Sequence, residues 1–298
     1  RNRDSRCWTR PCGPAEPSPL PEGLPPPPPN SQPMDTGLSH AKVAYPSPEH
    51  ERAAEAATEF FAGRPEAGAL LLVGSCARGK ASPDSCLDLG LLLSPGLTSA
   101  ARASLVRAWD LHRETAPAFE ALRRVGRFSN VEVDFHDGRF KPQARGWTSG
   151  PDPFELEIGN LLVYAAPLWE AEDHWRRLRA KWLPYYSEDL RQRRLAEAKR
   201  YCLNNLDHIP LYVKRGLYFQ SLSRLWQAFQ EFMQALFIAR RTYPIAYDKW
   251  IREQVVGILG LPELYPQLTR LFEIGQLESH ELAGKAKDLG ELLDDLVV

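Results

Sequence analysis

The chain has 298 residues, of which 43% are hydrophobic and 25% charged, an ordinary balance for a globular protein of one or two domains. Its formal net charge of −1 excludes a large basic surface, so nucleic acid is not expected as a partner, although a local basic patch stays open. No apolar run approaches the ~20 residues that cross a bilayer, and no secretory signal is visible, so we expect no membrane partner.

Cysteine usage indicates a reducing compartment. The spacing of the five cysteines forms neither a CxxC motif nor a disulfide framework. Free thiols persist where the environment is reducing, so we predict a cytoplasmic protein. The five residues are Cys7, Cys12, Cys76, Cys86 and Cys202.

The first 45 residues differ in composition from the rest of the chain. Pro25 to Pro29 are consecutive prolines, and Pro, Ser, Gly and charged residues surround them. Such a segment cannot bury enough apolar surface to offset its ordering entropy. We predict a disordered Pro-rich tail over 1–45 with some polyproline II character, and favour a plain tail over a ligand for proline-binding domains.

The first predicted helix follows this tail. It begins at Ser47-Pro48-Glu49, where Ser suits the N-cap and Pro suits the first helical turn. Apolar residues then recur at helical spacing as far as Phe61, and Gly63 ends the pattern.

Residues 69–93 hold two apolar runs joined by a loop rich in Gly and Ser. The runs 69–73 and 89–93 are long enough for buried strands, and Gly74-Ser75 directly follows the first. Glycine removes the side chain where a backbone approaches an anion, and successive N–H groups form an anion-binding concavity. Asp88, at the second run, then lies where a divalent cation would belong beside that anion.

A third strand is predicted over 129–136, where apolar and polar residues alternate. A helical segment over 98–125 precedes it, and Pro117 is expected to kink or split that segment. The strand's period places Asp134 on its polar face, while Cys86 and Asp88 share one face of the earlier strand. If the two strands are neighbours, Asp88 and Asp134 converge. The alternatives to Asp134 on the same face are Glu132 and His136.

From residue 171 onward the pattern is helical throughout. A helix is predicted over 187–206, and the clearest one over 211–240, with Trp226 in its apolar stripe as a core residue and Arg224 and Gln234 away from the stripe. Further helical segments are expected over 250–259, 262–274 and 282–296.

The stretch 71–93 resembles the signature of the nucleotidyltransferase superfamily that shares a fold with DNA polymerase beta. That signature is Gly-Ser, a later Gly, then Ser-Asp-x-Asp opening a strand. The matching residues, in order and spacing, are Gly74, Ser75, Gly79, Ser85 and Asp88. One position departs, because Cys86 stands where the family has its first Asp.

The helical half is similar to the partner domain of two-domain bacterial members of this superfamily. It has an Arg-Gly pair early in a long helix and a late Tyr-Pro…Lys-Trp sequence, and related enzymes modify aminoglycoside and lincosamide antibiotics. The resemblance implies an α/β (α+β) nucleotidyltransferase domain with a small mixed sheet over 46–168. An all-α helical bundle domain over 169–298 is implied to follow, with the cleft between the two.

The resemblance also implies a set of site residues. Asp88 and Asp134 would be catalytic and would ligate Mg²⁺ or Mn²⁺, with Cys86 at a degenerate metal position because a thiol suits Mg²⁺ poorly. The residues expected to hold the nucleotide are Gly74, Ser75, Arg78, Gly79, Ser85 and Lys249. Further candidates for the cleft are Arg215, Tyr218, Tyr247 and Trp250, and the general base stays open between Glu132 and a carboxylate of the helical half.

Three functions remain in view. The first is metal-dependent transfer of a nucleoside monophosphate from a nucleoside triphosphate to a hydroxyl of a small-molecule acceptor. The second is a catalytically degenerate, nucleotide-binding pseudoenzyme that acts through partner binding, which Cys86 favours. The third is a toxin-type enzyme that modifies RNA or protein, against which the near-neutral charge argues where RNA is concerned.

Overall fold

The computed structural model describes residues 42–297. The predicted Pro-rich tail as far as residue 41, with Cys7 and Cys12, lies outside the described residues. The last residues assigned to that tail are held by the fold, since the backbone N–H groups of Lys42 and Ala44 donate to the carbonyls of Ala77 (2.8 Å) and Cys76 (3.1 Å).

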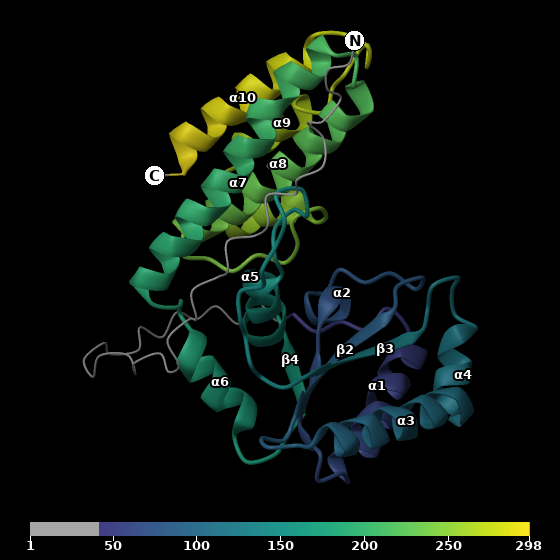
Figure 1. The fold of residues 1–298 in the computed structure, drawn as a ribbon. Coiled ribbons are helices and arrows are strands. Elements are labelled where there is room, and N and C mark those ends of the chain that lie inside the picture. The colour runs from purple at the N-terminus through teal and green to yellow at the C-terminus, as the bar shows by residue number, and fades with distance from the viewer. Residues whose placement is uncertain (1–41, 298) are drawn as a thin grey trace, which may run out of the picture. The chain divides into compact units, whose positions relative to one another are not determined.

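A small mixed sheet of four strands forms the first part of the fold (Figure 1). Its spatial order is β3-β2-β1-β4, and only β2 and β3 run parallel. The strands are β1 (Ala67–Leu72), β2 (Leu87–Leu93), β3 (Val131–His136) and β4 (Ala166–Glu170). The two apolar runs and the alternating segment therefore all form strands, and the expected mixed α+β class is confirmed.

The sheet is covered on both faces, which explains why β1 is apolar throughout. Successive side chains of β1 point to opposite faces, so Leu70 and Leu72 join one buried cluster while Ala69 and Leu71 join another. The first cluster includes residues of α1 (Pro48–Ala62), α3 (Ser99–Thr115) and α4 (Pro117–Arg123). The second includes residues of α5 (Phe154–Ile158), η1 (Gly159–Val163) and α6 (His174–Trp182). As expected, the chain breaks at Pro117, where α4 begins.

Helices make up the chain after α6. In Figure 1, α7, α8 and α10 run side by side, and each of these packs on the other two. They share a large apolar cluster, to which α9 adds Leu264 and Leu268. The elements are α7 (Glu188–Lys214), α8 (Tyr218–Ala239), η2 (Glu253–Ile258), α9 (Leu264–Arg270) and α10 (Glu281–Leu296).

Several expectations about α7 and α8 were wrong. The helix predicted to end at 206 continues as α7 through Pro210 to Lys214, and the break comes at Gly216, whose φ of +71° suits glycine after a helix end. Trp226 is 40% exposed and is not a core residue, because it lies at the edge of the bundle against the Phe229 and Phe272 rings.

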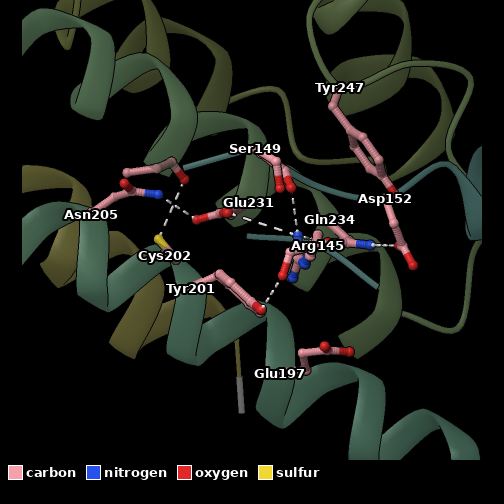
Figure 2. Close-up of polar contacts among 12 residues, drawn as sticks. Arg145, Ser149, Asp152, Glu197, Tyr201, Cys202, Asn205, Glu231, Gln234 and Tyr247 are labelled. Atoms are coloured by element: carbon pink, nitrogen blue, oxygen red, sulfur yellow. Dashed lines mark hydrogen bonds and ion pairs between the residues drawn. The ribbon is translucent and has the colours of Figure 1, made fainter. Parts of the chain in front are cut away.

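The polar residues of α8 were also misplaced, because Arg224 and Gln234 are buried. The reason is a buried polar network that the apolar stripe does not reveal (Figure 2). Arg224 donates to Oδ1 of Asn205 at 2.6 Å, and the Gln234 amide donates to Asp152 at 3.0 Å and Glu155 at 2.9 Å. Buried polar groups need partners, so these contacts fix α8 against its neighbours.

The segment 137–153 connects the sheet to this network. Its Arg145 enters between α7 and α8, with its guanidinium 4.0 Å over the Tyr201 ring and 3.8 Å from the Glu231 carboxylate (Figure 2). Arg194 of α7 forms buried ion pairs with Asp152 and Glu155 at the start of α5. These contacts set the position of α5, which borders the cavity described below.

The described residues all belong to one compact unit. Within 42–297 no helix combines the length and the apolar character needed to cross a membrane.

Candidate active site

A cavity of about 560 Å³ opens where β1 ends and β2 begins. One wall comes from the turn after β1, the start of β2 and the exposed face of β3. The other comes from α5, η1 and the segment 244–250. The lining residues are Val73, Gly74, Ser75, Arg78, Asp84, Ser85, Cys86, Asp88, Phe128, Asp134, His136, Leu156, Glu157, Asn160, Leu161, Ile245, Lys249 and Trp250.

The two predicted carboxylates meet in this cavity. β2 and β3 are parallel neighbours, with Asp88 opposite Glu132 and Gly90 opposite Asp134, so Asp88 and Asp134 are diagonal neighbours on one face. Burial is the main cause that raises the pKa of Asp88, while the positive charge of Lys249 acts in the opposite direction. Burial makes the ionised form of Asp88 costly, and a bound cation would offset that cost.

The neighbouring carboxylate of Glu132 is used elsewhere. Glu132 does not line the cavity; its carboxylate accepts from Asn130 at 2.9 Å and lies 3.7 Å from the Arg113 guanidinium. His136 does line the cavity, and burial lowers its pKa, which favours a neutral imidazole there. Of the three polar residues on β3, Asp134 is thus the carboxylate that faces the cavity.

Glycine is required at the turn after β1. Gly74 has a φ of +66°, and a Cβ at this position would lie 2.4 Å from Oδ2 of Asp88. The Asp88 carboxylate therefore rests directly against the backbone of the turn. Ser75, the next residue, also lines the cavity. The Gly-Ser pair brings a backbone turn and a hydroxyl to the side of the predicted cation ligand.

Cys86 contacts Asp88, as expected from their shared strand face. Its thiol donates to Oδ1 of Asp88 at 2.9 Å. Burial, with the adjacent carboxylate, raises the pKa of Cys86 to about 12, so the thiol stays protonated at neutral pH. Beside it, the Ser85 hydroxyl accepts from the Ser82 N–H at 2.9 Å and the Ser85 carbonyl lies 2.9 Å from the His50 ring.

Arg78 and Gly79 have structural contacts that the sequence did not indicate. The Arg78 guanidinium is buried and donates to the Gly74 carbonyl (2.8 Å) and to Glu253 (3.1 Å), which ties the turn to η2. Gly79 does not line the cavity. Its φ is +66°, and a Cβ there would lie 2.8 Å from the Lys42 carbonyl. Gly79 therefore leaves room for the backbone of this chain at Lys42.

The opposite wall carries Lys249 and Trp250, both exposed residues on the segment 244–250. Trp250 has a φ of +60°, a conformation that is rare for a bulky residue and is commonly retained at functional sites. Its ring lies 5.1 Å from the Arg78 guanidinium carbon. The expectation that Lys249 and Trp250 face the cleft agrees with this geometry.

One buried side chain, Gln254, holds that segment in place. Its Oε1 accepts from the N–H groups of Ile245 (2.8 Å) and Ala246 (3.4 Å), and its Nε2 donates to the carbonyls of Ala246 (2.8 Å) and Lys249 (3.0 Å). The segment has little regular structure of its own, so these contacts hold its backbone in place as far as Lys249.

Not every candidate reaches the cavity. Tyr247 is only 3% exposed and its hydroxyl donates to Glu155 at 3.4 Å, so it belongs to the buried network. Arg215 and Tyr218 lie at the turn between α7 and α8 and do not line the cavity. Tyr247 therefore fills the core and does not contact a ligand in this cavity.

The sequence did not single out the wall formed by α5 and η1. Asn160 lines the cavity and donates to the carbonyls of Leu156 (3.0 Å) and Ile245 (2.9 Å), which joins η1 to the segment 244–250. Glu157 also lines the cavity, and burial raises its pKa. The element η1 is π-helical and lines the cavity, and π-helical turns are frequent at functional sites.

The donor set fits one kind of metal site. Among residues 42–297, no group of three His, Cys, Asp or Glu side chains is arranged to hold a metal ion. Mg²⁺ is usually bound through one or two carboxylates together with substrate phosphates and water. Asp88 and Asp134 beside the Gly74-Ser75 turn suit that arrangement, whereas a site made of protein ligands alone is not available to them.

This chain matches no protein-family model, and no curated protein matches it.

Proposed function

We propose that this chain is a nucleotidyltransferase of the two-part kind, with the catalytic sheet in 46–168 and a helical domain in 169–298. The observation that carries the proposal is the convergence in one cavity of Asp88 and Asp134 from parallel strands, the Gly74-Ser75 turn, and Lys249 from the opposite wall. The two carboxylates suit a metal ion, and the Lys249 ammonium on the opposite wall suits the phosphates of a metal-bound triphosphate.

The proposed roles follow from position. Ser75 and the backbone N–H groups of its turn bind phosphate oxygens, and the Lys249 ammonium offsets their charge. Asp88 and Asp134 hold Mg²⁺ or Mn²⁺. When bound, the cation would stabilise the charge that develops as the acceptor hydroxyl bonds to the α-phosphorus in line and pyrophosphate leaves with the electron pair of the broken α–β phosphoanhydride bond. Trp250, partly exposed at the cavity edge, offers its ring face to the base.

Glu157 is the carboxylate best placed to accept the proton of the acceptor hydroxyl. It lines the cavity from α5, across from the β2–β3 wall, whereas Glu132 lies outside the cavity. Its raised pKa moves it toward the operating pH, which suits a general base. A small hydroxylated acceptor would enter between α5 and β3.

One observation favours a second candidate, a nucleotide-binding pseudoenzyme. The Cys86 thiol occupies one oxygen of Asp88 and brings no negative charge of its own at neutral pH. A thiol is a poor ligand for Mg²⁺, so the cation would rest on two carboxylates. Such a site would bind a triphosphate and turn it over slowly.

The test is transfer of label from each α-labelled nucleoside triphosphate, with Mg²⁺ or Mn²⁺, to a panel of small hydroxylated acceptors, an RNA and a protein extract. The proposal expects label on a small acceptor, abolished by Asp134→Asn and retained by Glu132→Gln. Binding of triphosphate without transfer to any acceptor would favour the pseudoenzyme. Label on RNA or protein alone would favour a toxin-type enzyme.

A further inference from the structure

A second cavity, of about 680 Å³, lies at the opposite end of the sheet. It is bordered by the end of α1, the start of β1, the ends of β2 and β4, and the first turn of α6. It shares no lining residue with the candidate active site. Its lining residues are Ala62, Gly63, Arg64, Pro65, Ala67, Gly68, Ser94, Pro95, Trp169, Ala171, Glu172, His174 and Arg177.

The backbone around this second cavity is irregular at two places. The β1–β2 register shifts between Ala67 and Ala69, and a Cβ on the intervening Gly68 would lie 3.0 Å from Cδ2 of His174. Glu172 and Asp173 both have positive φ, at 51° and 56°. Bulges recur next to functional sites, and strained residues cluster at ligand-binding positions. The missing Cβ of Gly68 leaves room for the His174 ring against the strand.

The cavity contains positive charge that the protein does not neutralise. Among the described residues, neither Arg64 nor Arg177 takes part in any of the ion pairs. The nearby carboxylates of Glu170 and Asp173 pair instead with Arg176. The acidic lining residue, Glu172, is exposed, as is Arg177. The Arg64 guanidinium is held in place 4.0 Å over the Phe60 ring.

Two buried nitrogen atoms also lack partners here. Within the described part of the chain, Nε of Arg64 and Nε2 of His174 are shielded from solvent and have no hydrogen-bond partner. Buried donors that stay unpaired are costly and call for an explanation. Both atoms are too shielded for a ligand to reach, so a ligand oxygen would bind the terminal guanidinium nitrogens of Arg64 instead.

We propose that this cavity is a second ligand site, which binds a small molecule through a phosphate or carboxylate group. Arg64 and Arg177 are the groups that recognise the oxyanion, because a guanidinium presents a planar fork that matches phosphate and carboxylate oxygens. The Trp169 side chain and the Ala62–Gly63 end of α1 provide apolar surface for the rest of the ligand. The site is independent of the proposed transferase activity.

The test is calorimetric titration of the full chain with inorganic phosphate and, separately, with a small tricarboxylate, at matched ionic strength. We expect at least one anion to bind with a Kd of about 1 mM, and Arg64→Gln and Arg177→Gln each to weaken that Kd about tenfold or more. The anion that binds more tightly shows whether the site recognises a phosphate or a carboxylate group. Arg107→Gln, which removes the same charge from an exposed position on α3, should leave the Kd unchanged.

Two controls keep the result specific to this cavity. Asp134→Asn should not alter the affinity, because that residue lies in the other cavity. The imidazole signals of His174 should shift on titration in the wild type, which supports the site even if an arginine variant folds poorly. The proposal is overturned if neither anion binds and His174 does not respond, or if Arg107→Gln weakens binding as much as Arg64→Gln.

Discussion

Replacing Cys86 by Asp tests the geometry of the candidate site in depth. The Cys86 thiol lies 2.9 Å from the Asp88 carboxylate, so an Asp at position 86 places a second carboxylate beside the first. Two charges about 4 Å apart repel by ~4 kcal/mol at an effective dielectric constant of ~20, and a hydrogen bond to Asp88 is lost as well. We expect Cys86→Asp to lower the free energy of unfolding by about 2–4 kcal/mol at pH 8 without a divalent cation.

The pH dependence of that loss has a definite sign. The repulsion raises the folded-state pKa of the carboxylate pair above its unfolded value, in addition to the rise that burial already causes at Asp88. Protonated, the pair does not repel, so the loss is absent below about pH 4 and grows as the pH rises through the raised folded pKa. A divalent cation should reverse it at pH 8.

The assay is denaturant unfolding of wild type, Cys86→Asp and Cys86→Asn at pH 5 and pH 8, with and without Mg²⁺. Asn has the shape of Asp without its charge and can donate to Asp88, so Cys86→Asn should remain within about 1 kcal/mol of wild type. At 1 kcal/mol per ~2–4 °C, a loss of about 2–4 kcal/mol lowers the melting temperature of the Asp variant by roughly 4–16 °C at pH 8. Equal stabilities of the Asp and Asn variants at both pH values would show that residue 86 does not face Asp88.

Three further outcomes follow from single contacts. Arg194→Met removes the ion-pair partner of two buried carboxylates and should lower the free energy of unfolding, measured with denaturant, by about 3–5 kcal/mol. Arg191→Gln, which removes a surface ion pair, should lower it by less than about 1 kcal/mol, and equal losses would contradict the buried network. Gln254→Ala should weaken triphosphate affinity measured by calorimetry at least tenfold while the protein stays folded, and an unchanged affinity would show that this anchor does not position the cavity wall. Gly79→Val should lower the melting temperature by several degrees because its Cβ meets the Lys42 carbonyl, and a melting temperature equal to that of wild type would refute that contact.

Sequence reasoning located the sheet side of the candidate site because its information is local. Two apolar runs, a Gly-Ser turn and a strand with period two place Asp88 and Asp134 on faces that pairing then brings together. The sequence did not predict that these two strands pair, since no local pattern specifies which strands become neighbours. The structure shows that β2 and β3 are parallel neighbours.

The helical side was harder to predict because its determinants are non-local. Gln254 reads as an ordinary polar residue of a helix, yet it is fully buried and holds a segment that begins ten residues earlier. Arg78 fits a phosphate-binding role by spacing, and its ion pair with Glu253 comes from the far half of the chain. Trp226 fits the apolar stripe but lies at the exposed edge of the bundle, which periodicity cannot indicate.

The most direct test of the central proposal is calorimetric binding of a non-hydrolysable nucleoside triphosphate in the presence and absence of Mg²⁺. We expect binding that requires the cation, lost at least tenfold in Asp134→Asn and retained in Glu132→Gln, a carboxylate on the same strand face that lies outside the cavity. Binding that is independent of Mg²⁺, or equally weakened by both substitutions, would contradict the assignment of this cavity as a metal-dependent nucleotide site.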